Sequence, residues 1–232
     1  MEGRSAFSVQ AVQSVLVLLA FLLISFSAQA AVLEDYRALL KCQDGAREAQ
    51  SVGRVMTNGS HGRLDVRLGK AGDFSLLIDS EEKKLRVLSH RLKAYVESAL
   101  EGDAQSWRGI VHSVSTVLLP QTLGIVSLQE KSCQELGRER VGRHGAEKSR
   151  CVFTLGFMGS YRDITVDVWD SKAFAPFPLK VEVIEDEKTR GGKAWLADIE
   201  AVREGKELFL LPEGYTRFTS VLDLILYALS AL

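Results

Sequence analysis

The sequence predicts an α+β protein: a strand-rich antiparallel sheet with a helix near each end of the chain and one in the middle. Short apolar stretches with a two-residue period follow one another at turn-length intervals over residues 63–98 and 150–186. This spacing is typical of antiparallel hairpins and differs from that of β–α–β units. Residues 103–119 instead have the apolar spacing of a helix, and residues 219–232 are strongly apolar with Asp223 as the only charge. Both features are typical of helices that pack on a sheet.

In the first half, a helix is expected over residues 32–43, because apolar residues such as Tyr36 and Leu40 lie four positions apart. The Asn58-Gly59 pair predicts a tight hairpin turn. Strands with turn-length links are then expected at residues 63–69, 74–79, 84–89 and 93–98. The pattern is that of a meander.

In the second half, residues 103–119 predict an amphipathic helix that Asp103 can cap and Pro120 ends. Strands are expected at residues 150–157, 163–170, 179–186 and 193–205. The segment before the third of these is irregular, because Pro176 and Pro178 donate no backbone hydrogen bond. A short 3-10 turn near residue 207 and a helical tail close the chain.

The N-terminus has the layout of a signal peptide. Arg4 precedes an apolar run over residues 14–26, and Ala28 and Ala30 stand at the -3 and -1 positions of a cleavage site. The run is shorter than the about 20 residues that cross a bilayer. The pattern therefore favours cleavage near Ala30, and a periplasmic or otherwise exported protein, over an uncleaved N-terminal anchor.

The mature chain, residues 31–232, is expected to be a single domain, because no repeat, linker or low-complexity segment divides it. The formal net charge is -1, and acidic and basic residues are interleaved. Nucleic acid is therefore not an expected partner, because binding to phosphates needs a concentrated basic face.

Three cysteines remain after the expected cleavage: Cys42, Cys133 and Cys151. The last two flank a polar, glycine-punctuated segment that can fold back as a hairpin, and an oxidising compartment permits a disulfide. We expect a bridge between Cys133 and Cys151. A bridge that involves Cys42 stays open, because connectivity cannot be deduced from spacing.

The sequence predicts no enzyme, no cofactor and no metal site. His144 lies between two cysteines, but neither a C-x-x-C pair nor a fourth ligand accompanies it. The stretch "GFMGSY" lacks the G-x-S-x-G pattern of a nucleophile elbow. The stretch "GRERVGRHG", residues 137–145, could hold an anion, but it lacks the strand–loop–helix setting of a phosphate loop and is interpreted as a hairpin tip.

Several segments resemble a family of small exported proteins of unassigned function, related to the periplasmic lipoprotein carriers of the LolA/LolB-like fold. They are "ELGRERVGRHGAEKSRCVF", "DVWDSKAFAPFPLKVEV", "ELFLLPEGYTRF" and the stretch over residues 62–97. The resemblance implies a curved antiparallel sheet, an incomplete barrel, whose apolar concave face is covered by helices. Residues 121–133 have no counterpart in the family, and no individual functional residue is carried over.

The resemblance implies a carrier-like protein that binds a lipid, an acyl chain or a lipoprotein on the concave face. The alternative is a non-enzymatic structural or interaction module of the cell envelope, with a fully packed interior and an envelope protein as partner. The helix over residues 103–119 either covers the core or acts as a lid over a ligand. The lid candidates are Trp107, Ile110, Val111, Val114 and Leu118.

Overall fold

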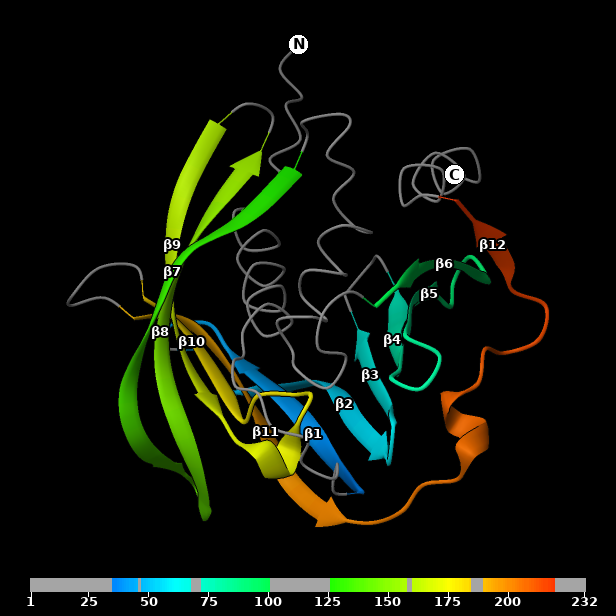
Figure 1. The fold of residues 1–232 in the computed structure, drawn as a ribbon, viewed down its shortest axis with the longest axis horizontal. Coiled ribbons are helices and arrows are strands. Elements are labelled where there is room, and N and C mark those ends of the chain that lie inside the picture. The colour runs from blue at the N-terminus through cyan, green and yellow to red at the C-terminus, as the bar shows by residue number, and fades with distance from the viewer. Residues whose placement is uncertain are drawn as a thin grey trace.

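The structure is a computed structural model, and it describes residues 35–45, 47–67, 72–100, 126–157, 160–184 and 190–219. These residues form one twelve-stranded sheet in the order β12-β6-β5-β4-β3-β2-β1-β11-β10-β9-β8-β7 (Figure 1). The strands are β1 (Tyr36–Gln43), β2 (Gln50–Asn58), β3 (His61–Arg67), β4 (Asp73–Asp79), β5 (Lys84–Ser89), β6 (Ala94–Ala99), β7 (Val126–Val141), β8 (His144–Phe157), β9 (Ser160–Asp170), β10 (Lys180–Ile184), β11 (Arg190–Ala201) and β12 (Thr216–Phe218). Two 3-10 helices, η3 (Lys172–Phe174) and η4 (Lys206–Phe209), lie in the connections.

The predicted antiparallel sheet is confirmed, with one exception at its edge. All neighbouring strands from β6 to β7 in the sheet order pair in antiparallel fashion, whereas β12 pairs with β6 in parallel. Because β12 follows β11 in sequence but lies at the far edge, the chain between them must cross the sheet. Within the described residues, the two edge strands, β12 and β7, are not paired with each other, so the sheet is curved and unclosed.

The connection between β11 and β12, residues 202–215, is here named the outer strap. It runs along the outside of the curved sheet, with η4 beside β3 and β4 (Figure 1). Arg63 Nη1 donates a hydrogen bond of 2.5 Å to the carbonyl of Leu208 in this strap. Arg63 therefore points to the convex side of the sheet. Leu64, its neighbour on β3, points to the concave side.

The helix predicted over residues 32–43 is wrong for the part that the structure describes. Residues 36–43 form strand β1 in the middle of the sheet, between β2 and β11. Tyr36, Ala38 and Leu40 are buried on one face, and Arg37 and Leu39 are exposed on the other. The segment is too short to show its period clearly, so the four-residue interval between Tyr36 and Leu40 fits both a helix and a strand.

The other predicted strands lie where the alternation places them, and Asn58 pairs with His61 across the predicted turn. The expected hairpin between the cysteines is also present, as β7 and β8. It extends back to Val126, so part of the stretch without a family counterpart belongs to a 16-residue strand. The expected signal peptide, the helix over residues 103–119 and most of the tail lie outside the described residues, so the covering helices stay a prediction. Among the described residues, no helix has the length and hydropathy needed to cross a membrane.

The main core lies on the concave side of the sheet. In antiparallel pairs, directly opposed residues point to the same face, so Val55, Leu64 and Leu76 form a row across β2, β3 and β4. The same register continues through β1, β11 and β10 to β9. Apolar side chains at these positions are buried and belong to one cluster.

Candidate functional site

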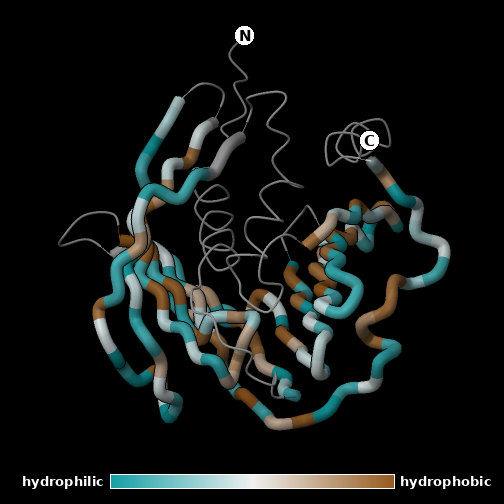
Figure 2. The backbone as a smooth tube through the Cα atoms, viewed as in Figure 1, coloured by the Kyte–Doolittle hydropathy of each residue, from teal (hydrophilic) through white to brown (hydrophobic). Residues whose placement is uncertain are grey.

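The concave face is the candidate site, and its buried members come from both halves of the chain. They are Tyr36, Ala38, Leu40, Val55, Leu64, Leu76, Ile78, Leu85, Val96, Cys151, Phe153, Val166, Val168, Val181, Ala194 and Leu196. Figure 2 shows the origin of this surface, because hydrophobic and hydrophilic positions alternate along the strands. The period of two therefore gives the sheet one continuous apolar face.

An aromatic cluster occupies one end of the concave face, where η3 follows β9. The Tyr36 ring meets that of Phe174 edge to face at a centroid distance of 5.3 Å, and His144 meets the same phenylalanine at 4.8 Å. Tyr36 Oη donates a hydrogen bond of 2.7 Å to the Phe174 carbonyl. Burial raises the pKa of Tyr36, and burial lowers the pKa of His144, with Arg143 adding to that shift. Both rings are therefore neutral at pH 7.

The same end is closed further by Phe177, which lies beyond the cis peptide bond between Ala175 and Pro176. A side chain at Gly62 would come within 3.3 Å of the Phe177 ring. The absence of a side chain at Gly62 thus lets the ring lie close to β3. The segment after η3 packs against the concave face.

Cys133 and Cys151 face each other across β7 and β8 and are joined by a disulfide. Cys151 is buried and belongs to the main core, and Cys133 packs against it. The bond therefore fastens the edge strand β7 from the concave side. Cys42 is the free cysteine.

Cys42 is predicted to resist thiol reagents at pH 8 while the protein is folded. Burial raises the pKa of the Cys42 thiol to about 12. At pH 8 only about one thiol in ten thousand is then a thiolate, the reactive form. Iodoacetamide labelling followed by mass spectrometry should be roughly a thousandfold slower than in urea-unfolded protein. Equal rates in the two states would contradict the prediction.

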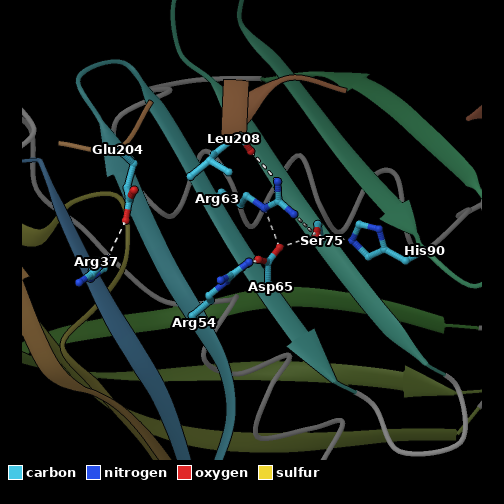
Figure 3. A network of polar contacts seen from close by, with 8 residues as sticks. All are labelled: Arg37, Arg54, Arg63, Asp65, Ser75, His90, Glu204 and Leu208. Atoms are coloured by element: carbon cyan, nitrogen blue, oxygen red, sulfur yellow. Dashed lines mark hydrogen bonds and ion pairs between the residues drawn. The ribbon is translucent and has the colours of Figure 1, made fainter. Parts of the chain in front are cut away.

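The convex side carries a polar network beneath the outer strap (Figure 3). Asp65 accepts hydrogen bonds from Arg54 at 2.9 Å, Arg63 at 2.7 Å and Ser75 at 2.5 Å. Burial alone would raise the pKa of Asp65, but these hydrogen bonds outweigh it, and the pKa is lowered. Asp65 is thus a charged centre that organises β2, β3 and β4.

The network continues from Ser75 to the strap. His90 Nε2 lies 2.6 Å from Ser75 Oγ, and its Nδ1 lies 2.6 Å from the hydroxyl of Tyr215. Because Ser75 donates to Asp65, a neutral His90 donates to Ser75 and accepts from Tyr215. The Asp65 carboxylate therefore contacts Ser75 and not His90. In a hydrolase triad, the carboxylate instead contacts and orients the histidine. Ser75 is only 1% exposed, so the network holds the strap and offers no accessible nucleophile.

Buried charges on the convex side of the second half are also paired. Asp167 is 3% exposed and receives two hydrogen bonds from Arg150, at 2.6 and 2.9 Å. Glu182, also 3% exposed, receives one from Lys180 at 2.7 Å. Lys180 in addition lies 4.0 Å from the centroid of the Trp169 ring. Each buried carboxylate thus has a cationic partner, and we interpret these pairs as structural.

The histidines do not come together in the part of the chain that the structure describes. His61 contacts Phe209 of η4, His90 belongs to the network under the strap, and His144 lies in the aromatic cluster. Over these same ranges, no group of three or more potential metal ligands is found. His112 and the lid candidates Trp107, Ile110, Val111, Val114 and Leu118 lie outside the described residues.

The hydrogen-bonded contacts that link Ser75, His90 and Tyr215 were not predicted from the sequence. These residues are scattered over β4, the turn after β5 and the strap, and His90 and Tyr215 are 125 positions apart in the sequence. No local pattern links them, so only the crossing of the strap over the sheet brings them together.

No protein-family model and no curated protein matches the sequence. Solved structures are similar to it. An uncharacterized conserved protein from Thermus thermophilus is 12% identical with a TM-score of 0.44, over 80% of this chain and 90% of that one. MucB is 13% identical with a TM-score of 0.38, over 92% of this chain and 66% of that one. The Mycobacterium tuberculosis lipoprotein LppX is 9% identical with a TM-score of 0.30, over 75% of this chain and 91% of that one. The solved structures similar to this chain thus include a lipoprotein.

Proposed function

We propose that the protein is an exported, carrier-like binder of a lipid, an acyl chain or the lipid-modified part of a lipoprotein, held on the concave face. The observation that carries the proposal is a continuous apolar surface on the inner side of an unclosed sheet. A curved sheet whose inner side is too wide for its own side chains to fill leaves a space, and apolar spaces bind apolar ligands. Within the described residues, the titratable groups of the concave side show no arrangement for catalysis.

The chemistry of the surface suits a flexible hydrocarbon. Each methylene that leaves water contributes about 0.8 kcal/mol, so an acyl chain needs no charged anchor along its length. Val66, Val87 and Val183 lie on the concave side and are only partly buried. These valines are the positions where a ligand can gain contacts on this face.

Two features support the exported setting. The chain begins with the basic, apolar and small-residue pattern of a signal peptide. The disulfide between Cys133 and Cys151 is of a kind that persists in oxidising compartments. Residues 31–232 would then be the single mature domain, with the helix over residues 103–119 as lid.

Delipidated mature protein is predicted to bind the neutral fluorescent probe N-phenyl-1-naphthylamine, and palmitate is predicted to displace the probe. Val87→Glu should weaken binding of the probe at least about tenfold, because a carboxylate in an apolar site costs more than about 1.4 kcal/mol. Fluorescence titration measures the affinity of the wild type and of Val87→Glu for the probe. Val87→Trp, which adds bulk without charge, serves as a second variant if the glutamate disturbs folding.

Val152→Glu is the matched control, because Val152 is a partly buried strand valine on the convex side, opposite Thr165. Its binding should equal that of the wild type, with folding of all variants compared by circular dichroism. The proposal would be overturned if the wild-type protein bound neither the probe nor palmitate.

A second candidate is an envelope module with a packed interior. The observation that favours it is the segment after η3, because Phe174 and Phe177 already fill one end of the concave face. Native mass spectrometry separates the two candidates. Protein purified without detergent should carry a lipid mass if it is a carrier, and none if the interior is packed.

A further inference from the structure

The concave face is more deeply buried at one end than at the other. Because the residues of one face alternate along a strand with those of the opposite face, the burial of this face can be followed from end to end. In three strands, its residues change from buried to partly buried in one direction. The change runs from Gly62 to Val66 on β3, from Ile78 to Phe74 on β4 and from Val168 to Ile164 on β9.

The buried end is the same in all three strands, and the segment 171–178 lies there. Gly62 and Ile78 pair with each other across β3 and β4. The Phe177 ring of the segment lies against the same glycine. On β9, the segment begins just beyond Val168, directly after the end of the strand. The concave face therefore has a closed end at this segment and a less covered end at the opposite ends of these strands.

Hydrogen bonds hold this segment in place. The Leu179 N–H donates to the Trp169 carbonyl at 2.9 Å and closes the base of the loop between β9 and β10. The Phe174 carbonyl accepts two hydrogen bonds, from the Phe177 N–H at 3.0 Å and from Tyr36 Oη at 2.7 Å. The second of these bonds joins the loop to β1. Phe174 and Phe177 are thus held at defined positions, and they are here named the aromatic wall.

The aromatic wall is closely packed. Phe174 is 7% exposed and Phe177 is 3% exposed. The rings of Tyr36 and His144 meet that of Phe174 edge to face. Because close-packed interiors are barely compressible, an acyl chain that reaches the wall cannot push it aside by one methylene after another. The wall therefore limits the length of chain that the concave face can cover.

The two ends of the concave face suit the two ends of an amphiphile. A charged or polar head at the closed end would lose its water among aromatic rings, and this loss costs free energy unless a new partner replaces the water. At the opposite end, Val66 and Ile164 are only partly buried, so a head group there keeps its contact with water. The chain is therefore expected to enter with its methyl end first.

We infer that Phe174 and Phe177 determine the specificity of the protein for chain length: the methyl end of a linear acyl chain abuts the aromatic wall, and the head group stays at the less covered end. The inference rests on the proposed function and specifies its ligand class, a linear acyl chain of limited length. Below the limit, each added methylene leaves water and raises the affinity about fourfold. Beyond the limit, an added methylene stays in water and brings no further gain.

A series of saturated fatty acids from octanoate to stearate tests this limit. Displacement of N-phenyl-1-naphthylamine from the folded, delipidated mature protein, below the micelle concentration of each acid, gives the affinities. For the wild type, affinity should rise with chain length and then reach a plateau. Phe174→Ala and Phe177→Ala, made singly, should move the plateau to chains about two to four carbon atoms longer, because each deletes a phenyl ring and leaves a cavity. Phe174→Leu, which disturbs the packing less, should give a smaller shift in the same direction.

Phe209→Ala is the matched control, because Phe209 is a comparably buried phenylalanine, 4% exposed, that lies in η4 of the outer strap. It should keep the wild-type plateau, since its ring does not belong to the concave face. Circular dichroism compares the folding of all variants. A general loss of stability lowers affinity at every chain length, whereas loss of the wall moves the plateau.

The possible outcomes separate the length limit from the binding site itself. Affinity that rises with every added carbon up to stearate in the wild type would overturn the limit while the apolar site stands. The same holds for a plateau that stays in place in the three wall variants, or one that also moves in Phe209→Ala. Binding of no fatty acid at all would remove the proposed function, and this inference with it.

Discussion

Replacing Cys133 and Cys151 together by serine is expected to lower the free energy of unfolding by about 3 kcal/mol. The disulfide closes a loop with a sequence separation of 18 residues, and a loop of this size is worth roughly 3 kcal/mol in the chain-entropy model. The effect should be concentrated in β7, which as an edge strand pairs only with β8 and has two register shifts along its length. Each shift leaves a residue unpaired, so the covalent bond secures a ladder that is weak in itself.

Urea unfolding followed by tryptophan fluorescence measures the loss, and hydrogen exchange locates it. Wild-type protein kept in a thiol reductant should match the double variant, because both lack the bond. Cys42→Ala is the control, since Cys42 takes no part in the disulfide. A loss below about 1 kcal/mol would mean that the strand pairing alone holds β7.

Gly53→Ala is expected to destabilise the protein by about 3 kcal/mol, at the upper end of overpacking effects. Gly53 lies on β2 opposite Val66 of β3. A Cβ atom at this position would lie 2.0 Å from the backbone oxygen of Asp65. Since the obstacle is backbone and not a flexible side chain, β2 and β3 must separate locally, in the middle of the sheet. The Arg54–Asp65 ion pair that bridges these strands should be disturbed as well.

Gly145→Ala is the matched control for that substitution. Gly145 also lies in a strand, its φ is not positive, and a Cβ atom there would have nothing within 4 Å. Its free energy of unfolding should stay within about 0.5 kcal/mol of the wild type in the same urea experiment. Equal losses of unfolding free energy in Gly53→Ala and Gly145→Ala would show that the close approach of β2 to β3 does not cause the destabilisation.

Alternation predicted most of the strands because it is a local property. Leu64 and Val66, or Val166 and Val168, lie on the concave face as their spacing indicates. The cysteine pair is likewise local, since the two residues flank a hairpin. Strand β1 was mistaken for a helix because its eight residues fit either period.

By itself, the sequence determined the strand-rich character, the apolar face and the exported pattern, because each depends on neighbours along the chain. Only the tertiary structure decided which distant strands pair: Arg37 of β1 lies beside Glu200 of β11, 163 residues away, and β12 joins β6 in parallel. The network under the outer strap followed from those pairings. Contacts across such separations leave no periodic signal in the sequence, because they arise from burial of the whole sheet and not from the propensity of any one segment.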